Sequence, residues 1–115
     1  MDISLVTKME FPFDEFMKLD MRIGKIEEAA QIPGSRKLMK LIVDFGSQKR
    51  QSVAGLLPNY KPEELIGKKF AFVLNIQRRK LMGIESQCMV LAADNEGKVV
   101  LLSPEKDITV GSRIR

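Results

Sequence analysis

The sequence contains no histidine and no tryptophan, and it has one cysteine and one tyrosine among its 115 residues. Without histidine, the chain lacks the side chain that most often acts as a general base near neutral pH. A lone cysteine without histidine is a poor candidate nucleophile, and it cannot form a Cys and His cluster for zinc. The glycines do not have the spacing of a phosphate-binding loop. We therefore expect a protein that is not an enzyme and that needs no cofactor or metal.

Long apolar runs are also missing, and this bears on the location of the protein. No stretch approaches the ~20 apolar residues of a membrane-spanning helix. The N-terminus has no basic start followed by an apolar core, so we expect no signal peptide. Cys88, the only cysteine, cannot form an internal disulfide, which is typical of proteins in a reducing compartment. These features predict a cytoplasmic protein with no membrane partner.

Positive charge is concentrated in the middle of the chain. Residues 33–80 contain eleven Lys and Arg against three acids, a net +8, whereas the rest contains eight against twelve, a net −4. Such asymmetry predicts a focused positive patch, which attracts polyanions and speeds their encounter with the protein. A solvated, lysine-rich surface would give the same totals, because many small domains are basic.

Alternating apolar residues predict a single all-β domain. The predicted strands are a long first strand between Asp20 and the turn at residues 32–35, followed by residues 37–45, 49–54, 70–76 and 86–93. Gly24 suggests a bulge or bend that would let the first strand pair on both sides. Pro62, two following acids and Gly67 predict one short helix between the third and fourth strands. This order is that of the five-stranded OB-fold barrel.

Two additions to the barrel are expected at its ends. Residues 1–12 should form an extended arm, followed by a short helix with Asp14 as its N-cap that ends near Leu19. The apolar face of this helix would either plug the barrel or pack on a second subunit, and the segment from Leu5 to Leu19 favours a dimer contact. Residues 94–97 should form a turn, with Val99 to Leu102 pairing as a hairpin extension.

The stretch from Asn75 to Met89 has the composition expected of a nucleic-acid groove. Cations beside small polar and soft apolar side chains can hold a phosphate backbone and a few unstacked bases. Because the loops after the first and fourth strands of an OB barrel border the usual nucleic-acid face, cations on both should contribute. The scarcity of aromatic side chains favours recognition of shape and backbone over base stacking. The predicted RNA-binding residues are Arg36, Lys37, Asn75, Arg78, Arg79, Lys80, Ser86 and Met89.

Several stretches together resemble one family. They are Leu19-Asp-Met-Arg-Ile-Gly-Lys-Ile, Lys37-Leu-Met-Lys-Leu-Ile-Val-Asp-Phe-Gly, Arg50-Gln-Ser-Val-Ala-Gly-Leu, Tyr60-Lys-Pro-Glu-Glu-Leu-Ile-Gly-Lys-Lys, and residues 75–93. The chain resembles the tRNA-binding domain found at the C-terminus of bacterial methionyl-tRNA synthetase and as free-standing proteins often called its β subunit. The domain of endothelial monocyte-activating polypeptide II belongs to the same group. The length is similar to that of the free-standing form.

The resemblance carries expectations about function. It implies an OB fold, binding of tRNA by structure without strong sequence preference, a homodimer, and an accessory role beside the catalytic subunit of methionyl-tRNA synthetase. The family's Ser-x-x-Met pattern falls on Ser86 and Met89, and its strand-four asparagine on Asn75. Its basic groove residues correspond to Lys37 and to the cluster at residues 78–80.

One departure from the family pattern keeps other ligands open. The family often has His-Pro-Asn-Ala-Asp-Lys before the second strand, whereas this chain has Ile-Pro-Gly-Ser-Arg-Lys at residues 32–37. Arg36 should strengthen backbone binding, and it is also a step toward a related OB-fold secretion chaperone whose turn carries Ala-Arg-Lys. The alternative hypothesis is therefore a chaperone that binds unfolded polypeptide in the same groove. A third possibility is a protein-interaction module for which RNA binding is incidental.

Overall fold

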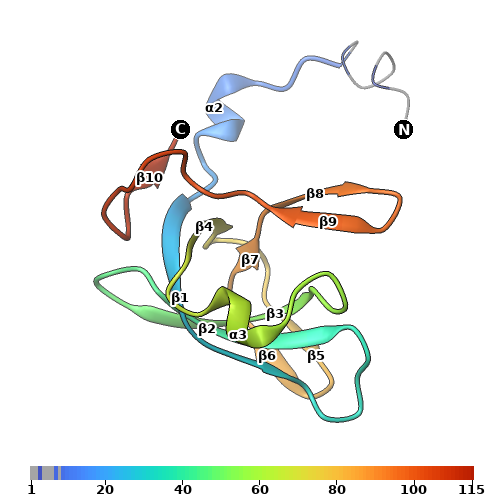
Figure 1. Ribbon diagram of the computed structural model, residues 1–115. Helices are drawn as coiled ribbons and strands as arrows, with labels where there is room; N and C mark the ends of the chain where they lie inside the picture. The colour runs from blue at the N-terminus through green and yellow to red at the C-terminus, as the bar shows by residue number, and fades with distance from the viewer. Residues whose placement is uncertain (1–2, 4–6, 8) are drawn as a thin grey trace.

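A nearly closed barrel of five strands, in the order β3-β2-β1-β4-β7, forms the body of the molecule (Figure 1). A computed structural model describes Ile3, Thr7 and residues 9–115 of the chain. The elements in chain order are α2 (Phe13–Phe16), β1 (Met21–Gln31), β2 (Leu38–Asp44), β3 (Lys49–Gly55), α3 (Pro62–Leu65), β4 (Lys69–Val73), β5 (Arg79–Leu81), β6 (Ile84–Ser86), β7 (Met89–Val90), β8 (Ala92–Asn95), β9 (Lys98–Leu101) and β10 (Arg113–Ile114). The predicted all-β OB-type architecture, with one short helix between the third and fourth strands, is confirmed.

Strand β1 pairs on both of its edges, as predicted. Its first half pairs with β4 from Met21 to Lys25, and its second half pairs with β2 from Lys25 to Gln31. The register shift lies between Ile26 and Glu28, so the bulge expected at Gly24 is misplaced. Gly24 has another role, because a Cβ there would lie 2.5 Å from Val43 Cγ1 and 2.6 Å from an edge atom of the Phe45 ring. Only glycine lets the two walls of the barrel approach so closely.

The barrel is closed by hydrogen bonds between β3 and the segment that leads from β6 to β7. The Gln87 N–H donates to the Gln51 carbonyl at 2.9 Å. The Val53 N–H donates to Ser86 Oγ at 3.0 Å, and Ser52 Oγ donates to the Cys88 carbonyl at 2.8 Å. Side-chain hydroxyls thus complete the ladder where the two backbones are not in register, because buried backbone groups must find a partner.

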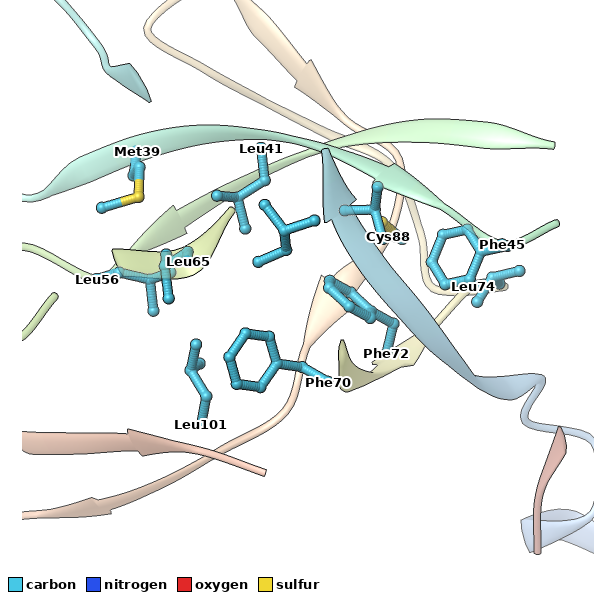
Figure 2. Packing of buried hydrophobic residues seen from close by; sticks show 12 residues of the cluster. Met39, Leu41, Phe45, Leu56, Leu65, Phe70, Phe72, Leu74, Cys88 and Leu101 are labelled. Carbon is cyan, nitrogen blue, oxygen red and sulfur yellow. The ribbon is translucent and has the colours of Figure 1, made fainter. Parts of the chain in front are cut away.

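The barrel interior is apolar and well packed (Figure 2). The alternating residues of β2 and its end, Met39, Leu41, Val43 and Phe45, are all buried, as their period of two predicted. The Phe45 and Phe72 rings meet edge to face, with centroids 5.4 Å apart and planes at 88°, a geometry that the ring quadrupoles favour. Phe70 and Phe72 of β4 are buried in the same core.

Helix α3 covers one end of the barrel and has the ends that the sequence predicted. Pro62 opens the helix, and Gly67 follows it with φ of +84°. The Lys61 N–H donates to the Glu64 carboxylate at 3.0 Å, which holds the first turn. Leu65 is fully buried in the main core cluster, so this short helix is held chiefly by its packing.

The N-terminal helix differs from the expectation. Helix α2 is a single turn preceded by Pro12, whose carbonyl accepts the N–H groups of Glu15 and Phe16 at 3.1 Å. Asp14 therefore lies inside the first turn instead of capping it. None of the helix residues is buried, so the helix does not plug the barrel. The dimer contact expected from Leu5 onward lies partly outside the described residues, which exclude residues 1–2, 4–6 and 8.

The predicted fifth strand is divided among three partners. Residues 84–86 pair with β5, residues 89–90 with β4, and residues 92–95 with β9. A period of two cannot reveal such changes, because a strand alternates in the same way whichever neighbour it has. The β5–β6 hairpin was missed, whereas the β8–β9 hairpin follows the prediction, with a turn at Glu96 and Gly97. Strand β4 ends before Ile76, which is therefore exposed, not in the core.

Candidate nucleic-acid interface

A groove of about 790 Å³ runs between the start of β2, the end of β3 and the β5–β6 hairpin. Its residues come from segments far apart in the sequence, and most of them are apolar. They include Leu38, Val53, Leu56, Ile76, Arg79, Leu81, Ser86, Cys88, Met89, Val90 and Val99. The groove therefore has an apolar lining with a cation at its edge. Predicted site residues Arg79, Ser86 and Met89 all line it, and Lys37 directly precedes Leu38.

The β5–β6 hairpin forms one side of the groove. Arg79 and Ser86 are direct cross-strand partners, as are Lys80 and Glu85. The hairpin turns at Met82 and Gly83, both with positive φ (+52° and +78°), which is the backbone of a tight two-residue turn. The three cations that the sequence assigned to a loop thus lie on or next to a hairpin whose ladder fixes their spacing.

The 32–37 loop lies beside the tip of this hairpin. A Cβ on Gly34 would sit 3.3 Å from the Met82 methyl carbon, so the two turns are in contact range. The loop is well defined, because Ser35 Oγ accepts the N–H groups of Lys37 and Leu38 at 3.3 and 3.0 Å. Arg36 and Lys37 are exposed. Cations from the first loop and from the hairpin therefore border the same end of the molecule.

Four of the predicted cations are exposed and have no acidic partner. In the part of the chain that the structure describes, Arg36, Lys37, Arg79 and Lys80 form no ion pair within 4.0 Å. Lys49 and Arg50 on β3 differ from these four. Lys49 pairs with Glu27 at 2.9 Å, and Arg50 donates to the carbonyls of Leu74 and Gln87 at 2.7 and 3.2 Å.

Arg78 is the one predicted cation that has an acidic partner. Its Nη1 atom lies 3.0 Å from Glu85 Oε1, and Gln87 Nε2 donates to the same oxygen at 3.1 Å. The hydrogen bond from Gln87, followed by that from Arg78, lowers the pKa of the Glu85 carboxyl. Glu85 is not among the site residues that the sequence predicts. Recognising Met82-Gly83 as a hairpin turn would have placed it opposite Lys80.

Ser86 and Asn75 have hydrogen-bond partners within the protein. Ser86 is buried, and its hydroxyl accepts from the Val53 N–H and donates to the Cys88 carbonyl at 3.2 Å. Asn75 accepts the Asp20 N–H through Oδ1 and donates through Nδ2 to the Lys18 carbonyl, both at 2.7 Å. Asn75 thereby fixes the segment that enters β1. Contact of either residue with RNA remains a prediction.

Met89 and Cys88 contribute soft side chains to the groove. Met89 is 43% exposed, unlike Met39, which is fully buried in the barrel. Cys88 is 1% exposed, and burial raises the pKa of its thiol to about 11. A thiol in this state is a packed apolar group, not a nucleophile.

The described residues include no cluster of three or more His, Cys, Asp or Glu that could hold a metal ion. Within the described chain, no helix has the length and apolar character needed to span a bilayer.

Comparison with known proteins gives a consistent picture. A family model described as "Putative tRNA binding domain" matches residues 21–113. The methionine–tRNA ligase of Methanococcus aeolicus is 56% identical over 108 residues, which is 93% of this chain but only 16% of the ligase.

Two solved structures superpose over nearly the whole chain. The MetRS related protein of Pyrococcus horikoshii has a TM-score of 0.88 and 42% identity, with 93% of this chain and 99% of that one covered. The chaperone CsaA of Bacillus anthracis has a TM-score of 0.85 and 31% identity, with 93% and 100% covered. The fold that carries the groove is thus shared by a protein described as related to MetRS and by a protein described as a chaperone.

Proposed function

The chain belongs to the tRNA-binding domain family, related to the C-terminal domain of methionyl-tRNA synthetase, and from that premise we propose that the groove binds folded tRNA by backbone and shape. The observation that carries the proposal is a set of four exposed cations without an ion pair among the described residues: Arg79 lines the groove, and Arg36, Lys37 and Lys80 lie on the 32–37 loop and on β5, the segments beside it. Such cations release counterions from phosphates and make affinity strongly dependent on salt.

The groove lining accounts for recognition without strong sequence preference. Reading of bases requires free donors and acceptors that match base edges. The hydroxyl of Ser86 already has a donor and an acceptor within the protein, and the amide of Asn75 is likewise occupied. Met89, Ile76 and Leu81 offer an apolar surface that can cover an unstacked base of any kind. Arg36, Lys37, Arg79 and Lys80 would contact phosphates, and Arg78 would do so after leaving Glu85.

We further propose that the domain acts as an accessory tRNA-binding unit of methionyl-tRNA synthetase in the cytoplasm. It would hold tRNA near the catalytic part and raise its effective concentration there without adding new chemistry. The exposed apolar side chains of the N-terminal segment, Met9, Phe11, Phe13 and Phe16, support a homodimer. Each of these points is an expectation that follows from family membership and from the exposed surface.

A second candidate function has its own support. The groove lining is mainly apolar, and the chaperone CsaA of similar fold is 31% identical. An apolar groove with cations at its edge can hold an extended, unfolded polypeptide. The unpaired cations favour a polyanion, because a typical unfolded chain has no dense negative charge to match them.

Charge reversal of Arg79 and Lys80 tests the tRNA proposal. Both side chains are exposed, and neither forms an ion pair with a described residue. Because Lys80→Glu places a second acid opposite Glu85, circular dichroism first checks that the variant with Arg79→Glu and Lys80→Glu keeps its fold. Each lost phosphate contact removes a charge-assisted hydrogen bond of about 1.5 kcal/mol. We expect tRNA affinity to fall roughly 100-fold in filter binding at about 0.1 M salt. The matched control reverses Lys68 and Lys106, which are exposed and lie outside the groove. Equal losses in both variants would refute the groove assignment.

Competition separates the two candidate functions. Labelled tRNA bound to the wild-type protein is challenged with unlabelled tRNA and with a reduced, carboxymethylated polypeptide. If the groove binds tRNA specifically, tRNA displaces the label and the polypeptide does not. Displacement by the polypeptide at similar concentration would favour the chaperone function.

A further inference from the structure

One carboxylate lies among the cations of the β5–β6 hairpin. Glu85 is the only acid between Asn75 and Met89, in a stretch with three cations. It is the cross-strand partner of Lys80, and its Oε1 atom lies 3.0 Å from Arg78 Nη1. Neither Glu85 nor Arg78 lines the groove, so this acid lies among the hairpin cations beside it, where it lowers the local positive potential that attracts a polyanion.

The position of Glu85 is fixed by more than this ion pair. Gln87 Nε2 donates to the Glu85 carboxylate at 3.1 Å, and Gln51 Nε2 donates to the Glu85 carbonyl at 2.8 Å. The Gln51 N–H also donates to Gln87 Oε1 at 3.2 Å. Through these amides the carboxylate is tied to β3 in the barrel wall, so it cannot move away freely when an anion approaches Arg78. A phosphate must compete with it for the guanidinium.

From this arrangement we infer that Glu85 is a specificity-determining residue that weakens the binding of short, flexible polyanions more than that of folded tRNA. The inference rests on the proposed tRNA function. A flexible polyanion can settle wherever positive charge is densest, which without Glu85 would be the hairpin. A folded RNA has fixed phosphates that meet the hairpin and the adjacent 32–37 loop together, so it cannot shift its charge toward Arg78 as a flexible chain can. Its affinity therefore depends less on Arg78.

The substitution Glu85→Gln tests the inference with little change in shape, since an amide oxygen can still accept from Arg78 and Gln87. Dissociation constants are measured for tRNA and for a 12-residue oligouridylate at about 0.1 M salt. We expect oligouridylate to bind about 5-fold more tightly and tRNA at most about 2-fold more tightly, in line with the range for exposed ion pairs. In an Arg78→Gln background, Glu85→Gln should have a smaller effect on both ligands.

A second comparison does not depend on the folding of the Glu85 variant. Because Arg78 is already neutralised and Arg79 is not, Arg78→Gln should weaken oligouridylate binding less than Arg79→Gln does. Unchanged or weaker oligouridylate binding by Glu85→Gln would overturn the inference, and so would equal losses for the two arginine variants. Failure of the wild-type protein to bind tRNA at all would count instead against the proposed function.

Discussion

Met39 and Met89 belong to two regions of the molecule that differ in what their side chains do. Met39 is fully buried among the apolar residues of the barrel, whose strands β1 to β4 have five to eleven residues. Met89 begins the short barrel strand β7, but its side chain is 43% exposed at the groove, beside a hairpin whose strands have three residues each. In the body, side chains hold the barrel closed, whereas around the groove cations and apolar groups remain available. Substitutions in the two regions should therefore affect different measurements.

The largest expected effect on stability comes from the barrel body. Replacing Gly24 with alanine would push a methyl group into Val43 and Phe45. Overpacking of this kind destabilises a core by about 3 kcal/mol. We expect a clear drop in the urea midpoint, with residual folded protein still binding tRNA. The matched control is Gly55→Ala at the end of β3, where no atom lies within 4 Å of the added methyl. Equal midpoints for the two variants would show that the approach at Gly24 is not tight.

Asn75 lies between the barrel core and the groove, and its substitution tests to which of the two regions it belongs. Its two hydrogen bonds to residues 18 and 20 are internal, so Asn75→Ala should lower the free energy of unfolding by about 1–2 kcal/mol. We expect tRNA affinity to change less than 3-fold, a shift of under ~0.7 kcal/mol. Asn95→Ala, on the exposed β8–β9 hairpin, serves as control. Unchanged stability with a 10-fold loss of affinity would assign Asn75 to RNA contact instead.

Replacing Cys88 should have the smallest effect on stability, and its pH dependence tests how well the barrel excludes water beneath the groove. Its thiol pKa is raised from 9.0 to about 11 in the folded protein. Between these values the unfolded chain loses the proton while the folded chain keeps it, so stability falls as pH rises. From pH 8 to pH 10 the wild type should lose about 1 kcal/mol more than Cys88→Ala. Parallel pH profiles would indicate a solvated thiol.

Most of the barrel could be predicted because its pattern is local. Alternation along β2 and β4 revealed buried strands, and the order of Pro62, two acids and Gly67 revealed α3. The division of residues 84–95 among three strands could not be predicted, since it depends on which neighbour each short segment meets as the barrel closes. The bulge in β1 was misplaced for a related reason. Position 24 must be glycine because Val43 and Phe45 approach it closely across the barrel. These residues are distant in the sequence, so the sequence does not reveal the contact.

For the candidate site, the sequence identified residues but not their partners. Arg79, Ser86 and Met89 do line one groove, and Arg36 and Lys37 lie on the adjacent 32–37 loop. Three of the hydrogen bonds of Ser86 and Asn75 connect them to residues 33 to 57 positions away. Such long-range pairing is invisible without the fold. The charge pattern likewise could not reveal that Arg78 forms an ion pair with Glu85, whereas Arg79 and Lys80 form none with any residue that the structure describes.

The pairing of β10 with the first residues of β1 has an architectural consequence. Met21 lies opposite Ile114, and Arg113 donates to the Met17 carbonyl at 2.8 Å. The chain therefore enters and leaves the barrel at one corner, away from the β5–β6 hairpin in Figure 1. A neighbouring domain grafted before residue 17 or after residue 114 would be tethered at that corner and would leave the groove unobstructed. A second domain could therefore be fused at either end of the barrel without a change in its strands.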